Sequence, residues 1–536
     1  MPKQKVVSAD VAECFIQNSG SVIATARALG IARSTVRAHL VNTGLGKKPL
    51  VGGKQQTEFT TAILPRRGKV KRYLLTSAQN NTHVHAAFWE NVKALAAHYG
   101  AQILVGTFSY NQNNFGKLAV KRGKDKPTEQ TLWFDPAVVP YISDEKITLA
   151  PGLRWCGNMN IQPTEDNPIS GLETYGGADS TIFPHTKIEM RSISTTPDQS
   201  PKMIYTTGAV TMMNYIQKKL GIKAEHHHRY AALIVEVDSG GAWWVRQVAS
   251  RKNGQNIQDL NVSVSDGAVV STKAVTEAIT WGDLHATIAH PEVVETAQDM
   301  LDSLRPKHQF IHDIMEGVSI NPHMRTQKAI HEKFTAWLRG LSRVDEELRQ
   351  TRVVLEKYLR PWCKTVCPDA NHDRSWLKKW LREYDYRVDP PNTELFLRMQ
   401  KFMYEELRAG KMAKNVNLIK FALENEAGLK AGAIRFLLPD EPYELCEVEC
   451  GLHGHLGPNG SFGSPAALAK IGKKATTAHT HSAGIYHGLY VAGTSSLLTT
   501  DWDYTAGPSS WSHSHVVLYP NGQRAVVTMK AGKWHA

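Results

Sequence analysis

The stretch AVTEAITWGDLHA, residues 274–286, decides how the C-terminal half of this 536-residue chain is expected to fold. It begins as an apolar, strand-like run and ends in Asp283-Leu284-His285. Because residues i and i+2 of a strand share one face, the carboxylate of Asp283 and the imidazole of His285 converge. In an open α/β sheet, sites assemble at the carboxyl ends of the strands. The stretch therefore predicts a strand of an α/β sheet that delivers two polar side chains to a site.

Four downstream segments end in the same way, with Asp, Asn or His after an apolar run. They are HQFIHDIMEG (308–317), TVCPDANHDR (365–374), ELCEVECGLHGHLG (444–457) and TTAHTHSAG (476–484). Stretches with helical spacing separate some of these runs, at 291–304 and over about 326–360. Strands that alternate with helices are typical of an α/β fold. Each polar cluster alone is a weak signal, whereas their order along the chain is a strong one.

The order D-x-H, D, N-H-D, H and H-x-H, over about residues 273–500, resembles the calcineurin-like metallophosphoesterase superfamily, with its SbcD-like nuclease and phosphodiesterase branch. The resemblance implies a β-sandwich flanked by helices over residues 273–536, built around two divalent metal ions. Three positions depart from the family pattern, since His312, Ala370 and Ala478 stand where a glycine usually precedes a ligand. None of them removes a ligand, but each is expected to shift a loop or to narrow the approach.

The resemblance implies seven metal ligands. These are Asp283, His285, Asp313, Asn371, His453, His479 and His481. Asp283, His285 and His481 would hold the first ion, and Asp313 would bridge to the second, which the other three would complete. His455 is the alternative to His453. Carboxylate, amide and imidazole ligands without thiolate suit Mn²⁺, which we expect first, or Mg²⁺, Fe or Zn²⁺.

The N-H-D block implies the catalytic side chains. His372 matches the histidine that family members use near the leaving group, and Asp373 would orient it. A histidine there can donate a proton to the departing oxygen or stabilise charge on it. Arg374 either pairs with phosphate or forms a surface salt bridge.

Residues 8–43 predict three short helices, with a tight turn at Gly30 before the third. This layout resembles the helix-turn-helix of bacterial and phage DNA binders over about 35 residues, and a small bundle for protein contacts is the alternative. In the DNA-binding reading, the third helix offers donors to a groove. They are Arg33, Ser34, Thr35, Arg37 and His39.

The net charge of +13 is concentrated at the N-terminus. Residues 1–72 contain thirteen Lys and Arg against three acidic residues, which gives +10, and the remaining 464 residues carry only +3. This asymmetry favours a polyanionic partner, and nucleic acid in particular, because neutralising phosphates releases counterions. We therefore expect a helix-turn-helix domain over residues 1–50, a basic linker over 51–72, and DNA as the partner.

Residues 73–272 predict an α/β region of unknown role. RYLLTSAQ (72–79), VHAAFWENVKALAAHYG (84–100) and AQILVGTF (101–108) read as strand, helix and strand. A hairpin is expected where YAALIVEV meets AWWVRQVAS across a glycine turn. The segment 110–200 has no assignable pattern, and no internal repeat is evident.

The composition excludes a membrane span, a signal peptide and a disulfide framework of the six cysteines. The expected location is cytoplasmic, in a host bacterium if the chain is phage-encoded, as this domain combination suggests. The leading hypothesis is a metal-dependent DNA nuclease targeted by the helix-turn-helix. The alternatives are a phosphatase or small-molecule phosphodiesterase with an accessory DNA-binding domain, and a catalytically inactive DNA-binding regulator. A homo-oligomeric state stays open.

Overall fold

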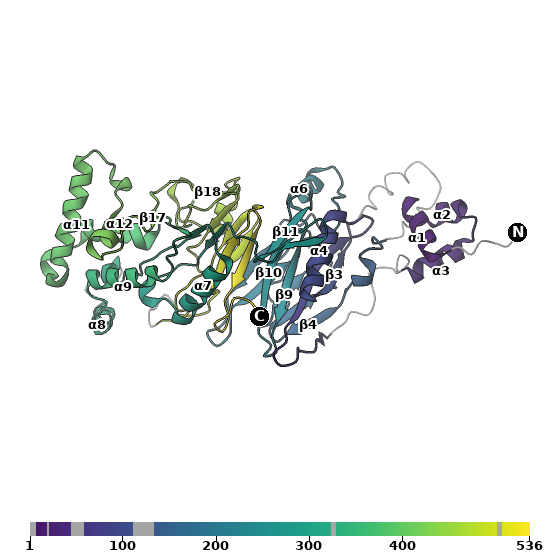
Figure 1. Cartoon of the computed structure of the whole chain (residues 1–536), viewed down its shortest axis with the longest axis horizontal. Helices are drawn as coiled ribbons and strands as arrows, with labels where there is room; N and C mark the ends of the chain where they lie inside the picture. Colours follow the sequence, from purple (N-terminus) through teal and green to yellow (C-terminus); the bar gives the residue numbers. More distant parts are fainter. Residues whose placement is uncertain (1–6, 19–20, 44–57, 111–132, 323–328, 501–505) are drawn as a thin grey trace. The chain divides into compact units, whose positions relative to one another are not determined.

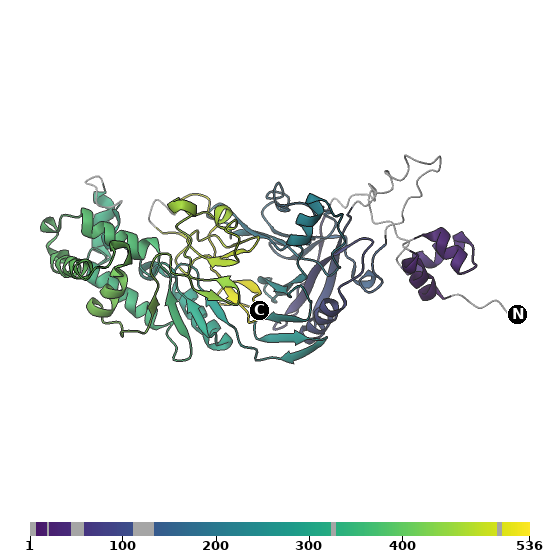
Figure 2. The same ribbon diagram turned by 90° about the horizontal axis from the view of Figure 1, so that it is seen from above.

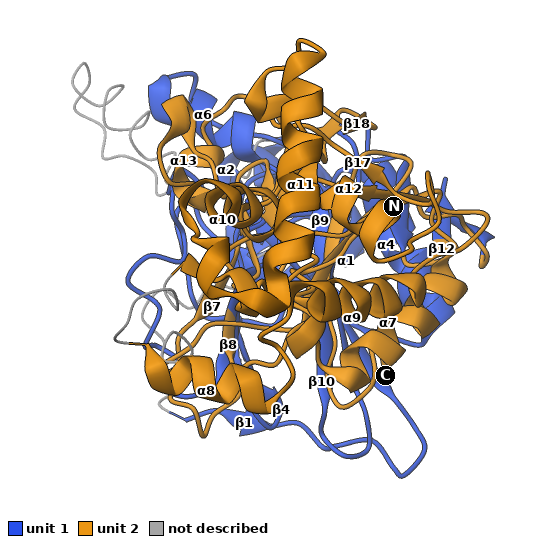
Figure 3. Ribbon diagram, turned by 90° about the vertical axis from the view of Figure 1, so that its left-hand side faces the viewer, with its two compact units in different colours: residues 1–189, 204–259, 263–271 blue, residues 190–203, 260–262, 272–536 orange. Residues whose placement is uncertain are grey.

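The computed structural model describes residues 7–18, 21–43, 58–110, 133–322, 329–500 and 506–536. The chain forms a mixed α/β structure of two compact units (Figure 3). The first unit contains residues 1–189, 204–259 and 263–271, and the second contains 190–203, 260–262 and 272–536. Residues 51–57 of the predicted basic linker fall outside the described residues, and its remainder contains β1 (Thr60–Thr61) and the first residues of β2 (Lys71–Gln79). No described helix combines the length and the apolar character that a membrane crossing requires.

The three helices expected near the N-terminus are present as α1 (Ser8–Gln17), α2 (Val22–Ala28) and α3 (Arg33–Asn42) (Figure 1). Val11, Phe15 and Val36 are fully buried in a small shared core. The Ser21 hydroxyl accepts a hydrogen bond from the Ala24 amide and caps α2. Gly30 turns the chain toward α3 with a left-handed φ of 62°.

The first unit is built on a four-stranded sheet in the order β10-β9-β2-β3. Its elements are β2 (Lys71–Gln79), α4 (Ala86–Tyr99), β3 (Gln102–Phe108), β9 (Ala231–Val237) and β10 (Trp243–Ala249). Strands β2 and β3 are parallel and are joined through α4, whereas β9 is antiparallel to both β2 and β10. The strand, helix, strand and hairpin predicted here are therefore confirmed.

The stretch without an assignable sequence pattern contains short strands. They are β4 (Lys146–Ala150), β5 (Leu153–Cys156), β6 (Ser180–Phe183), β7 (Met190–Ile193) and β8 (Lys202–Thr206), preceded by β1 (Thr60–Thr61). Strands β4 and β5 form a hairpin, and β5, β6 and β8 run parallel. Later elements are α6 (Lys219–His227), β11 (Asn256–Asp259), β12 (Val262–Ser265) and β13 (Ala268–Ser271). Strands of two to five residues leave too little alternation for a sequence to reveal them.

The second unit contains a six-stranded sheet in the order β17-β16-β15-β14-β23-β24. Its strands are β14 (Ala278–Thr280), β15 (His308–Phe310), β16 (Lys364–Cys367), β17 (Arg435–Phe436), β23 (Ser514–Leu518) and β24 (Arg524–Thr528). Strands β14 to β17 are parallel, and the β23–β24 hairpin pairs antiparallel with β14. Parallel strands require crossovers, and α7 (Pro291–Leu304) provides the one between β14 and β15.

Both faces of this sheet are covered. Alternate residues of each strand enter two different apolar cores, because side chains of a strand alternate between faces. Ile279 and Ile311 belong to the core that contains the helices, whereas Ala278 and Phe310 belong to one shared with Val448 of a second layer of strands. Burial on both faces explains why the runs before the polar clusters are almost wholly apolar.

The second layer of this unit contains five strands of the C-terminal half. They are β18 (Glu444–Leu445), β19 (Val448–Glu449), β20 (Ala475–Thr477), β21 (Gly484–Tyr486) and β22 (Leu489–Val491), with β7 pairing at β21. Strands β19, β20 and β22 are parallel. Between β15 and β17 the chain forms α8 (Ile330–Leu338), α9 (Val344–Glu356), α10 (Leu377–Glu383), α11 (Pro390–Arg408) and α12 (Leu418–Phe421). Figures 1 and 2 show that these helices gather at one end of the unit.

Candidate metal centre

The five polar clusters predicted from the sequence follow five strand ends of the second unit. Asp283 and His285 follow β14, Asp313 follows β15, and Asn371 follows β16. His453 follows β19, and the pair His479 and His481 follows β20. Parallel strands present their carboxyl ends at the same edge of a layer, so each layer delivers its polar loops to one side. The structure brings all seven predicted ligands together.

The first group consists of Asp283, His285 and His481, whose ligand atoms all lie within 4.8 Å of one another. Nε2 of His481 lies 3.0 Å from Nε2 of His285 and 3.0 Å from Oδ2 of Asp283. Asp283 is fully buried, and His285 is 2% exposed. The three residues match the set that the resemblance implied for the first metal ion.

The second group consists of Asp313, His453 and His479, again with ligand atoms within 4.8 Å. Nε2 of His453 lies 3.2 Å from Oδ2 of Asp313 and 3.1 Å from Oδ1 of Asn371. The side-chain oxygen of Asn371 is therefore a fourth possible donor atom beside this group. Nδ1 of His453 lies 3.7 Å from Oδ1 of Asp283, so the two groups are immediate neighbours.

Four of the seven residues have a backbone conformation that amino acids other than glycine rarely adopt. The φ angles are 43° at His285, 39° at Asp313, 72° at His479 and 57° at His481. A left-handed backbone at a residue with a side chain costs about 1–3 kcal/mol and persists only where the surrounding structure enforces it. Such residues concentrate at functional sites. The fold therefore holds these side chains in place at an energetic cost.

Carboxylates dominate the electrostatics of the cluster. Burial opposes a charged His285, but the charges of Glu316, Asp313 and Asp283 outweigh it and raise the pKa of His285 to about 10. Burial likewise opposes a charged His453, whereas Asp313 and Asp283 raise its pKa to about 9. Burial also disfavours both aspartates as anions, yet the neighbouring imidazoles hold the pKa of Asp313 and of Asp283 well below the usual range. Buried carboxylates that favour the protonated form of neighbouring imidazoles would also favour a metal cation in place of those protons.

The donor set fits divalent metal ions. Two imidazole nitrogens 3.0 Å apart, as in His285 and His481, either share one proton or face one ion. Oδ2 of Asp283 is buried and lies 3.0 Å from Nε2 of His481. An ion between these three side chains would satisfy all of them. Carboxylate, amide and imidazole ligands together suit Mn²⁺, Fe and Zn²⁺.

His372 lies beside both groups. Its backbone N–H donates to Oδ1 of Asp313 at 3.1 Å, and its Nδ1 donates to the carbonyl of Glu316 at 2.7 Å. Its ring stacks on Trp376, with centroids 3.8 Å apart. Burial lowers the pKa of His372, and the charge of Asp313 partly offsets that effect. Because Nδ1 is committed to a carbonyl, Nε2 is the atom available for proton transfer.

Asp373 contacts the backbone rather than the ring that it was predicted to orient. Its carboxyl oxygens accept hydrogen bonds from the amides of Ile314 and Met315, at 3.1 and 3.0 Å. Burial, and then the charge of Asp313, raise the pKa of Asp373 to about 8. Asp373 therefore anchors the loop that follows Asp313, and the Glu316 carbonyl fixes the ring of His372.

Glu316 was not singled out from the sequence. It is 3% exposed, and its Oε2 lies 2.8 Å from Nδ1 of His285. A carboxylate on the second nitrogen of a ligating histidine fixes the ring orientation and raises the basicity of the ligand. The signal that could have found it is an acidic residue enclosed in the otherwise apolar run IMEGV (314–318).

His312, which replaces the usual glycine, supports His453. The two rings stack with centroids 5.4 Å apart, and their Nδ1 atoms lie 3.3 Å apart. Burial lowers the pKa of His312 to about 3, so that ring is neutral and accepts the proton of the His453 Nδ1–H. This leaves Nε2 of His453 directed to the second group. His312 thus has a local structural role beside His453.

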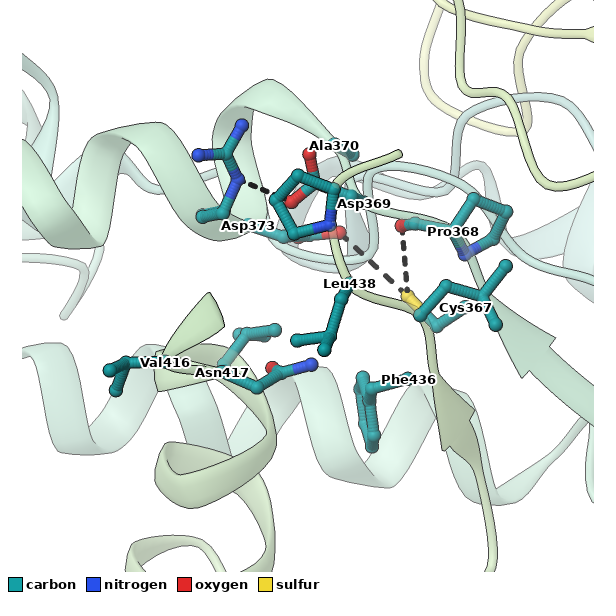
Figure 4. A pocket seen from close by; sticks show the side chains of 13 residues that line it. Cys367, Pro368, Asp369, Ala370, Asp373, Val416, Asn417, Phe436 and Leu438 are labelled. Atoms are coloured by element: carbon teal, nitrogen blue, oxygen red, sulfur yellow. Dashed lines mark hydrogen bonds and ion pairs between the residues drawn. The ribbon is translucent and has the colours of Figure 1, made fainter. Parts of the chain in front are cut away.

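Three other polar side chains adjoin the cluster. His455 lies with Nε2 3.9 Å from Oδ2 of Asp369, and it is His453 rather than His455 that joins the second group. Arg374 forms an ion pair with Asp369, one of the two roles expected for it. Asp369, Asp373 and Cys367 line a small pocket next to the N-H-D segment (Figure 4).

Four of the five residues predicted to contact DNA are exposed on α3. They are Arg33, Ser34, Thr35 and Arg37. His39 is only partly exposed, and its Nδ1 lies 2.8 Å from the Ser8 hydroxyl at the start of α1. That hydrogen bond ties α3 to α1, so His39 serves the packing of the three helices. Ser8 is the first residue of α1, and Val7 is the N-cap of this helix.

Comparison with known proteins supplies a relative. The chain is 34% identical over 478 residues to Protein A1 of Escherichia phage T5, and the match covers 87% of this chain and 83% of that protein. The similarity supports a phage origin for the chain. No family model matches the chain, and no solved structure matches it. By the extent of this similarity, the chain belongs to the family of Protein A1 of Escherichia phage T5.

Proposed function

We propose that this protein is a metal-dependent DNA nuclease that hydrolyses phosphodiester bonds at a centre of two divalent ions, with the arrangement of a calcineurin-like metallophosphoesterase. One observation carries the proposal. Two adjoining buried groups, Asp283 with His285 and His481, and Asp313 with His453 and His479, each bring one carboxylate and two imidazoles within 4.8 Å. An ordinary protein core does not collect so many ionisable groups without a use for them.

The ions would draw a phosphodiester into place, offset its charge and activate water for attack. The protein's own residues prepare the site for this. Asp313 lies in the second group while its Oδ1 accepts the His372 amide, so it fixes the ligands and the proton donor relative to each other. Glu316 and His312 set which nitrogen atoms of His285 and His453 face the ions. The surrounding burial excludes bulk water, which strengthens each electrostatic interaction.

His372 is the residue proposed to exchange a proton with the leaving oxygen. Its Nδ1 is held by the Glu316 carbonyl, and Trp376 supports the face of the ring. The fixed ring can therefore present Nε2 in one direction, as general acid catalysis requires. Such a contribution is worth about 10²–10⁴ in rate.

DNA as the substrate is supported by the N-terminal helices. Arg33 and Arg37 are exposed on α3, and residues 1–72 carry a charge of +10. A helix-turn-helix places its second helix in the major groove, and basic side chains next to it neutralise phosphates. Targeting to DNA would bring a long polymer to a centre that can hydrolyse its backbone.

The test uses the purified full chain with linear duplex, circular and single-stranded DNA, and with bis-p-nitrophenyl phosphate as a small diester. Each reaction contains Mn²⁺, Mg²⁺ or EDTA. We expect cleavage of DNA that requires the metal ion and falls about 10²–10⁴-fold in His372→Ala. We expect Asp313→Ala to abolish hydrolysis of every substrate and still to bind DNA.

The possible outcomes separate the candidate functions. Turnover of the small diester without DNA cleavage would replace the nuclease by a phosphatase or small-molecule phosphodiesterase. Binding of DNA without turnover of any substrate would leave an inactive regulator. Unchanged cleavage in His372→Ala would remove that residue from the mechanism while leaving the metal centre in place.

A further inference from the structure

The main sheets of the two units have the same topology. In the first unit, parallel strands β2 and β3 are joined through α4, and the hairpin β9–β10 pairs antiparallel with β2. In the second unit, parallel strands β14 and β15 are joined through α7, and the hairpin β23–β24 pairs antiparallel with β14. The orders β10-β9-β2-β3 and β24-β23-β14-β15 therefore correspond strand by strand.

The two crossover helices agree in detail. Each contains 14 residues and ends at a residue with left-handed backbone. Each is preceded by a histidine, His85 or His290. The amide of His85 donates to the carbonyl of Val210 at 2.7 Å, and the amide of His290 donates to that of Ser495 at 2.8 Å. A shared sheet order alone does not require these bonds.

The strand registers then align the two units residue by residue. In the first unit Ile204 and Tyr205 of β8 face Thr181 and Ile182 of β6, and the sequence continues as IYTTG (204–208). In the second unit Leu489 and Tyr490 of β22 face Ala475 and Thr476 of β20, and the sequence continues as LYVAG (489–493).

With this register, the H-x-H segment of the second unit aligns with the residues that follow β6 in the first unit. The residues after β20 are Ala478, His479, Thr480 and His481, and the residues after β6 are Pro184, His185, Thr186 and Lys187. His185 therefore corresponds to the candidate ligand His479. Lys187 corresponds to the candidate ligand His481.

A second correspondence involves the H-G-H segment, residues 453–455. Arg154 of β5 faces Thr181 of β6, and Glu449 of β19 faces Ala475 of β20, in two parallel pairs. Because Thr181 corresponds to Ala475, the segment GNMN (157–160) that follows β5 occupies the place of LHGH (452–455). Asn158 then corresponds to the candidate ligand His453.

The remaining correspondences follow from backbone bonds at β2 and β14. The carbonyl of Ser77 accepts a hydrogen bond from the Val210 amide at 2.9 Å. In the same way, the carbonyl of Asp283 accepts a hydrogen bond from the Ser495 amide at 2.7 Å. Three residues further on, the Asn80 amide donates to Phe108, and the Ala286 amide donates to Ile314. These bonds pair the candidate ligands with uncharged residues. Asp283 corresponds to Ser77, His285 to Gln79, and Asp313 to Thr107.

We propose that the first unit is a second copy of the fold of the second unit, and that its metal centre has been dismantled. The description of the cluster in the second unit as a metal site rests on the proposed function. The duplication of the fold rests on topology and strand register alone. Both aspartates are replaced by hydroxyl residues, and a lysine stands at one histidine position. Divalent ions require anionic or neutral donor atoms, and an ammonium group excludes them.

The substituted side chains are engaged within the first unit. The Ser77 hydroxyl donates to the carbonyl of Gly208 at 2.6 Å, and Nε2 of His185 donates to that of Gln162 at 3.1 Å. Nζ of Lys187 lies 2.6 Å from Oε1 of Glu189, and both residues are buried. In the first unit, hydrogen bonds and an ion pair thus engage the side chains at the positions of the candidate ligands. The chain is expected to bind two divalent ions and not four.

The test counts ions in the full chain and compares two asparagines, one in each unit. The chelator-stripped protein is titrated with Mn²⁺ by calorimetry, and bound manganese is counted after gel filtration. We expect two ions per chain. We expect Asn371→Ala to weaken one of them about tenfold or more, as a loss at a metal site typically does. Asn158→Ala, at the exposed position of the first unit that corresponds to His453, should change neither the count nor the affinity.

Each other result has a defined meaning. Four ions per chain, or loss of an ion in Asn158→Ala, would overturn the proposal. No bound ion in the wild type would overturn the proposed function and leave the first unit metal-free as inferred. Turnover provides a second comparison, in which His372→Ala loses activity and Asn158→Ala keeps it. A lower rate in Asn158→Ala at unchanged melting temperature would also contradict the proposal.

Discussion

At the scale of single residues, the orientation of three imidazoles of the cluster, those of His285, His372 and His453, depends on a partner outside the seven candidate ligands. Glu316 contacts Nδ1 of His285, and its own carbonyl holds Nδ1 of His372. Nδ1 of His312 accepts a hydrogen bond from Nδ1 of His453. Nδ1 of His515 accepts a hydrogen bond from the Gly282 amide, just before Asp283. An imidazole has two nitrogens, and a bond at one decides which remains for chemistry. These partners therefore prepare the site as much as the ligands do.

We expect Glu316→Gln to weaken Mn²⁺ binding about 10–100-fold, because the amide removes the charge that raises the basicity of His285. The change is nearly isosteric, so the fold should be retained. Calorimetric titration with Mn²⁺ measures the effect, and circular dichroism checks the fold. Glu356→Gln, which removes an equal charge from an exposed position near the end of α9, serves as the control. Equal affinity in the two variants would show that Glu316 has no role in orienting the ligand.

At the scale of elements, helix α3 and the loops after the parallel strands carry the side chains that the proposed function uses. The apolar runs before Asp283, Asp313 and Asn371 were predicted as strands and are β14, β15 and β16. Burial on both faces makes such runs legible in a sequence. The clustering of the ligands was predictable because sites form at strand ends. The role of Asp373 was not, since it depends on two backbone amides from another loop.

Arg33→Ala combined with Arg37→Ala is expected to weaken DNA binding and to make it less sensitive to salt. Each phosphate contact contributes about 0.9 to the slope of log K against log salt, so the slope should fall by up to about 2. Fluorescence anisotropy with a labelled duplex at several salt concentrations measures this. The matched variant Lys401→Ala with Arg408→Ala removes the same charge from exposed positions of α11. A similar change of slope in both variants would refute a specific role for α3.

At the scale of the whole molecule, the sequence concealed a repeat. No internal repeat was evident, because the residues that mark the second unit as a site are replaced in the first by Ser77, Gln79 and Thr107. The two units share strand register and backbone hydrogen bonds. Many different sequences can form the same register and bonds, so these features leave no repeat in the sequence. The similarity of IYTTG and LYVAG is visible only once the strands align them. Topology therefore preserved a relation that side-chain chemistry had lost.

Buried neutral histidines should make the first unit sensitive to acid. Burial lowers the pKa of His185 to about 4 and that of His228 to about 3. An unfolded histidine titrates near 6.5. Between these values the unfolded chain binds more protons than the folded one, so stability is full above about pH 6.5 and is lost as the pH falls toward 4. For His185 the loss amounts to about 3 kcal/mol at most.

Urea unfolding of the wild type and of His185→Gln at pH 7.5, 5.5 and 4.5 measures this dependence. The wild type should lose its advantage over the variant as the pH falls, because glutamine cannot take up the proton. His98→Gln, at an exposed histidine of α4, is the matched control for the loss of an imidazole. A difference between the wild type and His185→Gln that stays constant with pH would contradict the assignment of a neutral buried ring.

The left-handed backbone at His285, Asp313, His479 and His481 has an evolutionary consequence. Glycine adopts this conformation without penalty, so stability alone would favour glycine at each of the four places. A lineage that no longer required this site would accumulate such replacements and would gain stability as it lost the site. Persistence of Asp and His there, against that pull, would be a signature of selection for activity in any future collection of related phage sequences.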